Sequence, residues 1–160
     1  MAARHHDILA YKAHDIASNL YTLFVINTTT YVFPMKTVIS IHQAIELAMK
    51  AAILKETQSK LRTSNFSESL VAIQTNPLLS GLKQRMFLTG TENRLRELNN
   101  CRNSHQHNGA KMEKFRTGRL HFVDLVRDSL TTLLRLLSEC NVDVSELVLV
   151  LSQFAGVNWP

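Results

Sequence analysis

The sequence predicts an all-α protein, a compact up-and-down bundle of about five or six helices. Apolar residues recur at helical spacing along most of the chain, and few segments alternate apolar and polar residues as strands do. Only five Gly and three Pro occur in 160 residues, which favours long helices over many tight turns. A chain of this length with 45% hydrophobic residues suits one domain, residues 1–160, with its own core.

Two long helices are expected in the first third of the chain. The first covers about residues 8–25 and ends at the polar stretch 27–30. The second covers about residues 34–55, and Pro34 suits its first turn because the backbone N–H that proline lacks has no partner there. The apolar stripes are Leu9, Ile16, Leu20, Leu23 and Phe24 in the first helix, and Ile41, Ile45, Ala48, Ala52 and Leu54 in the second.

The rest of the chain predicts one short helix and three longer helical segments, most of them preceded by a polar residue that can cap the first turn. We first expect a cap at 64–67, a short helix at about 68–74 and a connector at Pro77 and Gly81. A helix capped by Thr89 or Thr91 follows, with Leu95 and Leu98 inward, and then a basic loop at 109–118. Next come a helix at about 119–139 and a last helix, which is capped by Asp143 or Ser145 and runs to Phe154. The helix at 119–139 has an apolar stripe of Leu120, Val123, Val126, Leu130, Leu133, Leu134 and Leu137.

Composition argues against several classes of protein. No apolar run approaches the roughly 18 residues needed to span a bilayer. Residues 1–7 have no apolar signal core, so export is not expected. The two cysteines, Cys101 and Cys140, have no metal-ligand spacing and do not form a disulfide framework pattern. A reducing cytoplasm is therefore the expected location.

The segment Arg-Asn-Ser-His-Gln-His, residues 102–107, carries the most chemical information. It ends a predicted helix just before Asn108 and Gly109, which form a turn signal. Histidine supplies acid–base chemistry near neutral pH, and arginine supplies a planar fork that matches phosphate oxygens. Asn103 and His107 are four residues apart and share a helix face, to which the long stem of Arg102 can bring its guanidinium. Such groups can move a proton and stabilise a phosphorane without a metal.

Positive charge is concentrated around this segment. The net charge of the chain is +5. Residues 83–119 contain nine Lys or Arg and three Glu, a balance of +6, so the remainder of the chain has a balance of −1. A basic field beside a group that handles phosphate is what a nucleic acid partner requires, although a solvated basic surface without a partner would have the same composition.

The segment resembles the signature of the HEPN superfamily, which is Arg, four to six residues and then His, with Asn, Asp or His often following the Arg. Arg102, Asn103 and His107 match that signature. A second spacing, Arg116 to His121, lacks the polar residue after the arginine. The run at 41–51, Ile-His-Gln-Ala-Ile-Glu-Leu-Ala-Met-Lys-Ala, is similar to an early helix of the family. The resemblance covers most of the chain and implies a helical bundle that pairs as a homodimer.

The resemblance also implies an activity. Members of the family cleave RNA without a metal or another cofactor: the ribose 2′-hydroxyl attacks the adjacent phosphorus and leaves a 2′,3′-cyclic phosphate. In this chain it implies His107 as general acid or base, Arg102 as the group that binds the scissile phosphate, and Asn103 as the residue that orients them. His105 ranks second for the role of His107. We expect RNA contacts from His105, Lys111, Lys114, Arg116 and Arg119.

Many such proteins are toxins or antiviral effectors. The resemblance thus implies a cognate antitoxin or a larger defence complex as a partner of this chain, and no membrane. Some members carry a Tyr two residues after the motif His, which a nucleotidyltransferase modifies. Gly109 stands at that position here, so this form of neutralisation is not expected.

Other polar groups are alternative candidate sites. The N-terminal residues His5, His6, Asp7, His14 and Asp15 offer metal-ligand atoms but no recognisable ligand set, and we expect no metal.

Single side chains gave further alternatives. Cys101 beside His105 is expected to be a buried hydrophobe and not a nucleophile. His42 and Glu46 form an i,i+4 pair that predicts a helix-surface contact, and Glu46 has the same spacing to Lys50.

Two rival interpretations stay open at this point. One is a non-catalytic module of the same family that dimerises or binds nucleotides or RNA. The other is a helical scaffold in which Arg102 pairs with Glu97 or Glu113 on the surface.

Overall fold

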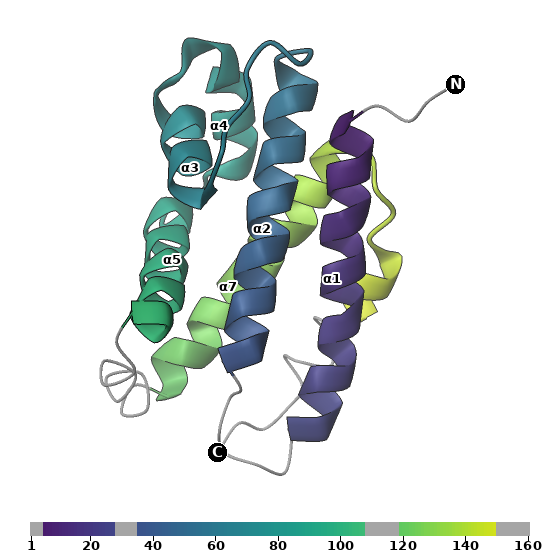
Figure 1. Cartoon of the computed structure of the whole chain (residues 1–160), viewed down its shortest axis with the longest axis vertical. Helices are drawn as coiled ribbons and strands as arrows, with labels where there is room; N and C mark the ends of the chain where they lie inside the picture. The colour runs from purple at the N-terminus through teal and green to yellow at the C-terminus, as the bar shows by residue number, and fades with distance from the viewer. Residues whose placement is uncertain (1–4, 28–34, 108–118, 150–160) are drawn as a thin grey trace.

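The computed structural model describes the backbone of residues 5–27, 35–107 and 119–149, and the side chains of residues 5–19, 38–103 and 125–149. Every regular element in these ranges is helical, which confirms the predicted all-α bundle. Figure 1 shows α2 between α1 on one side and α3, α4 and α5 on the other, with α7 crossing behind. The long helices α1, α2, α5 and α7 alternate in direction, as in an up-and-down bundle (Figure 1). The elements are α1 (His5–Asn27), α2 (Met35–Glu56), α3 (Phe66–Thr75), η1 (Pro77–Leu79), α4 (Ser80–Met86), α5 (Thr91–His107) and α7 (Arg119–Glu139), and residues 145–149 are also helical.

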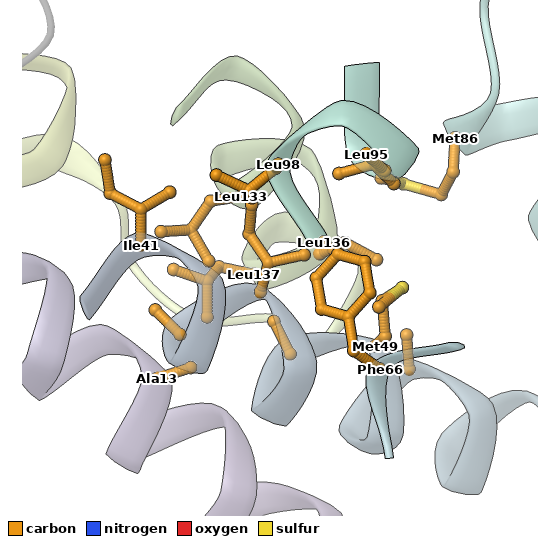
Figure 2. Packing of buried hydrophobic residues seen from close by; sticks show 14 of the residues in the cluster. Ala13, Ile41, Met49, Phe66, Met86, Leu95, Leu98, Leu133, Leu136 and Leu137 are labelled. Carbon is orange, nitrogen blue, oxygen red and sulfur yellow. The ribbon is translucent and has the colours of Figure 1, made fainter. Parts of the chain in front are cut away.

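The central helix α2 contacts α1, α3, α5 and α7. Its predicted stripe is correct, because Ile41, Ile45, Ala48, Ala52 and Leu54 are all buried. Figure 2 shows Leu98 of α5 and Leu133 and Leu137 of α7 converging over α2. This shared core fixes where α5 lies, and α5 carries the Arg102 segment.

The packing of α1 on α2 differs from the expectation. Among the described side chains of α1, the fully buried ones are Ala10, Ala13 and Ala17, whereas Leu9 and Ile16 are only partly buried. Side chains as small as alanine let two helix axes approach closely, and α2, which contacts α1, also has several buried alanines. The side chains of Leu20, Leu23 and Phe24 lie outside the described residues.

The expected connector at Pro77 and Gly81 is helical, so that prediction was wrong. Asn76 begins the segment by accepting a hydrogen bond from the backbone N–H of Leu78 at 3.0 Å, and Pro77 fits the first helical position. The buried residues of the segment are Leu79, Leu82 and Met86, which recur at helical spacing. Burial of this stripe outweighs the cost of one glycine within α4.

The caps of the other helices agree only in part with the prediction. Asn65 caps α3, with its side-chain oxygen accepting from the backbone N–H of Glu68 at 2.8 Å. Asp143 accepts from the backbone N–H of Ser145 at 3.0 Å, as expected before the last helix. The residue before α5 is Gly90 and not a threonine, and its φ of 88° suits glycine. None of the described helices is long and apolar enough to cross a membrane.

Candidate functional site

The candidate site lies on α5. Leu95, Leu98 and Cys101 are fully buried, which fixes the inward face of this helix. Asn99 and Arg102 are three residues apart, and the two side chains lie half-buried on the edge of that face, one turn apart. Asn103 follows at the four-residue spacing from Asn99 and is half-buried too. The apolar stripe therefore presents these three polar side chains together along one line of the bundle.

A buried histidine of α2, His42, is hydrogen-bonded to Asn99 of this row. The side chains of His42 and Asn99 form a hydrogen bond of 2.8 Å between Nε2 and Oδ1. Because the amide oxygen can only accept, Nε2 of the imidazole carries the hydrogen. Asn99 in turn donates from Nδ2 to Oγ of Ser67, at the start of α3, over 3.1 Å. The ring of His42 stacks on that of Phe66 with centroids 4.2 Å apart, and the histidine is only 3% exposed.

Burial decides the protonation state of His42. It lowers the pKa of His42 below its usual 6.5, and the positive charge of Arg102 lowers it further. The hydrogen bond to Asn99 and the negative charge of Glu46 oppose these two effects without reversing them. His42 is therefore a neutral hydrogen-bond donor near pH 7, and Arg102 is close enough for its charge to act on the ring.

Arg102 differs from the other arginines of its neighbourhood. Its Nη1 donates to Oδ1 of Asn103 over 3.1 Å, and it has no carboxylate partner among the residues whose side chains are described. By contrast, Arg94 pairs with Asp128 at 2.9 Å and with Glu97 at 3.3 Å. The surface pairing of Arg102 with Glu97, one form of the scaffold interpretation, is thus absent from the described part of the chain. A half-buried guanidinium with no carboxylate partner among the described side chains has the donor geometry to bind an anion.

The described part of the chain contains only some of the predicted site residues. Arg102 and Asn103 lie side by side and are hydrogen-bonded. His105 and His107 belong to the last turn of α5, four residues after Cys101 and Asn103 respectively, and their side chains lie outside the described residues.

The predicted RNA contacts fall almost wholly outside the described residues. Arg119 begins α7, but its side chain is not described. Lys111, Lys114 and Arg116 lie outside the described residues, as do the turn at Asn108 and Gly109 and the whole basic loop.

Sequence reasoning missed His42 and Asn99. The expected surface contact of His42 with Glu46 is wrong, because His42 is buried and bonds α5, while Glu46 pairs with Lys50 at 2.9 Å. The signal was available but weak. His42 directly follows Ile41 of the buried stripe, which places a polar ring at the edge of the core.

The alternative sites gain no support. Within the described residues no three His, Cys, Asp or Glu side chains are grouped to hold a metal ion. At the N-terminus His6 pairs with Asp7 at 3.1 Å, and His14 lies 3.9 Å from Asp15. Burial raises the pKa of the Cys101 thiol to about 11, so this cysteine stays protonated as a buried small side chain.

No known protein-family model, curated protein or solved structure matches this chain. The residues of the site are therefore the only guide to its function. Its described core consists of the Arg102 guanidinium, which bonds Asn103 and has no carboxylate partner among the described side chains, and the neutral imidazole of His42, which bonds Asn99.

The buried His42 predicts a specific pH dependence of stability. Its pKa is lowered in the folded chain and near 6.5 in the unfolded chain, so the unfolded chain binds the proton more readily. The stabilisation should be complete above about pH 6.5 and should be lost as the pH falls from there towards the folded pKa. Urea unfolding of the natural chain and of His42→Gln at about pH 7.5 and about pH 5.5 measures this. The glutamine variant should lose less stability on acidification, whereas equal losses would mean that His42 does not titrate as a buried group.

Proposed function

We propose that this chain is a metal-independent endoribonuclease in which Arg102, Asn103 and His107 form the catalytic group. The observation that carries the proposal is Arg102, half-buried, hydrogen-bonded to Asn103 and without a carboxylate partner among the described side chains. A guanidinium has five N–H donors and only one is committed to Asn103. The remaining donors match the oxygens of a phosphodiester.

The proposed reaction is an in-line transfer at phosphorus. The 2′-hydroxyl loses its proton to a base as its oxygen bonds the adjacent phosphorus, and the bond to the 5′-oxygen breaks as that oxygen gains a proton. The products are a 2′,3′-cyclic phosphate and a 5′-hydroxyl. His107 is the proposed base or acid, one helical turn beyond Asn103. Arg102 stabilises the negative charge that grows on the phosphorane oxygens.

The partners of the described basic residues support this assignment. Four basic residues of the segment 83–119 are committed to protein partners. Lys83 donates to the Gln74 carbonyl at 3.2 Å, Arg85 contacts Glu56 and Glu139, Arg96 pairs with Glu92 at 2.9 Å, and Arg94 pairs with Asp128. Arg102 has no carboxylate partner among the described side chains, and it is proposed to bind RNA together with His105, Lys111, Lys114, Arg116 and Arg119.

A homodimer would complete the proposed site. One His107 cannot accept and donate a proton at the same moment, and His42 is too deeply buried to be the second group. A two-fold interface would bring a second copy of Arg102 and His107 to a shared basic cleft. We expect a dimer by light scattering at micromolar concentration. We also expect mixed His107→Ala and Arg102→Ala chains to regain part of the activity that each has lost. A monomer that cleaves RNA at the full rate would contradict this arrangement.

The same observation supports one alternative, a non-catalytic module that binds RNA or a nucleotide. Arg102 can bind a phosphate whether or not His107 moves a proton. RNA binding that depends on Arg102 without any cleavage would favour the module over the nuclease.

Incubation of RNA with the purified chain in excess chelator tests the proposal. Cleavage is expected, and a requirement for added divalent metal would contradict the mechanism. If cleavage is found, the proposed biological setting is a cytoplasmic toxin or antiviral effector that is restrained by a cognate antitoxin or held in a defence complex.

A further inference from the structure

Three helices are joined by polar side chains directly beside Arg102. His42 of α2 bonds Asn99 of α5, and Asn99 bonds Ser67 of α3. We call these three residues the polar clamp. The ring of His42 is stacked on Phe66, which leaves the imidazole little freedom to turn. The clamp thus fixes one point of α5 against two other helices.

Asn99, where the clamp holds α5, is close to Arg102 and Asn103. Asn99 precedes Arg102 by three residues and Asn103 by four, so all three lie within about one helical turn. At this level of α5, Leu98 and Cys101 are fully buried small or apolar side chains. Apolar contacts are non-directional, whereas hydrogen bonds have narrow limits of distance and angle. The clamp therefore supplies directional contacts at the level of Asn99, as the Arg94–Asp128 pair to α7 and the bond from Arg96 to Gln74 of α3 do nearer the start of α5.

We propose that the polar clamp of His42, Asn99 and Ser67 positions Arg102 and Asn103 for the phosphate of bound RNA. That RNA is the ligand rests on the proposed function, whereas the hydrogen bonds of the clamp do not depend on it. His42 is a positioning residue and not a catalytic one, because its side chain is 3% exposed and cannot reach an RNA phosphate.

The charges around His42 agree with a neutral positioning role. On α5 the facing charge is that of Arg102, which a protonated His42 would repel. On α2 it is that of Glu46, which is already paired with Lys50 at 2.9 Å. On α3 the nearest carboxylate along the chain is Glu68, which accepts a hydrogen bond from Ser64. None of these three charged groups would favour a positive charge on His42 enough to offset its burial.

Three variants of the full chain separate positioning from plain stability. His42→Gln keeps an N–H donor that can reach Asn99, whereas His42→Leu removes it. Ile53→Val is the control, because Ile53 is fully buried in α2 and 11 residues, about 16 Å, beyond His42. The first readouts are the melting temperature and the kcat and KM for RNA cleavage in chelator. A further readout is the NMR order parameter of the Arg102 Nε–H bond, with and without inorganic phosphate.

His42→Leu should lower kcat by about tenfold to a hundredfold, as expected for a misplaced phosphate-binding group, and should loosen the Arg102 Nε–H group. His42→Gln should keep kcat and the order of the Arg102 Nε–H group close to those of the natural chain. Ile53→Val should lose stability but retain kcat and the order of Arg102. An unchanged Arg102 group and kcat in His42→Leu would overturn the proposal, and so would equal losses of kcat in Ile53→Val at a similar melting temperature.

The readouts also separate this inference from the proposed function. If the natural chain does not cleave RNA, the nuclease proposal fails, while a loosened Arg102 group in His42→Leu still supports the clamp. If His42→Leu does not fold, Ser67→Ala replaces it, because Ser67 is exposed and its loss breaks only the bond to Asn99. That variant should loosen Arg102 measurably, and an unchanged Arg102 group in Ser67→Ala would then count against the clamp.

Discussion

Replacing His107 with alanine is expected to slow RNA cleavage by at least about a hundredfold, because general acid–base catalysis by one side chain contributes on the order of 10²–10⁴ in rate. Binding of RNA should change little, since phosphate contacts come from other residues. Single-turnover cleavage of a labelled RNA in excess chelator measures the chemical step. The matched control is His5→Ala, which removes an exposed imidazole of α1.

Two outcomes bear on the assignment of His107. If His107→Ala retains full activity and His105→Ala does not, the acid–base role belongs to His105, which has the second-ranked position in the same turn of α5. If neither change slows cleavage, an imidazole of this segment is not part of the chemistry.

Replacing Arg102 with alanine is expected to have an effect of similar size. Loss of one donor to the charge of a transition state costs about 10²–10³ in rate. Arg102→Lys should recover only part of that loss, because lysine keeps the charge but not the planar fork. The control is Arg85→Ala: Arg85 is bound to Glu56 at 2.8 Å and to Glu139 at 3.0 Å, and Glu56 lies 14 residues beyond His42 on α2.

The Arg102 series also tests the observation on which the proposal rests. If Arg85→Ala slowed cleavage as much as Arg102→Ala, the loss would reflect general charge or stability and not a phosphate site. If Arg102→Lys were as active as the natural chain, two-point contact with the phosphate would play no role.

The long helices could be predicted because their information is local. The stripe of Ile41, Ile45 and Ala48 in α2 is read from spacing alone, and it is buried as predicted. The same reasoning failed at Pro77 and Gly81, where residues that commonly break helices stand beside the buried Leu79, Leu82 and Met86. Burial of that stripe is a property of the assembled bundle, so a local rule about proline and glycine could not anticipate it.

In the site, too, contacts between sequence neighbours could be predicted and contacts between distant residues could not. Arg102 and Asn103 are neighbours in the sequence, and their contact at 3.1 Å follows from adjacency and the length of the arginine stem. His42 and Asn99 are 57 residues apart, and no periodicity connects them. Their pairing depends on how α2 and α5 are rotated against each other in the bundle, which single-helix patterns leave undetermined. For this reason the clamp emerged only from the structure.

In the proposed mechanism, Arg102 and His107 promote cleavage of RNA by attack of its own 2′-hydroxyl. The most direct measurement is the identity of the new RNA ends after incubation with the natural chain in excess chelator, beside the Arg102→Ala and His107→Ala chains. We expect 2′,3′-cyclic phosphate and 5′-hydroxyl ends from the natural chain, and no cleavage of an RNA whose 2′-hydroxyls are methylated. Ends with a 5′-phosphate, cleavage of the methylated RNA, or unchanged cleavage by both variants would contradict it.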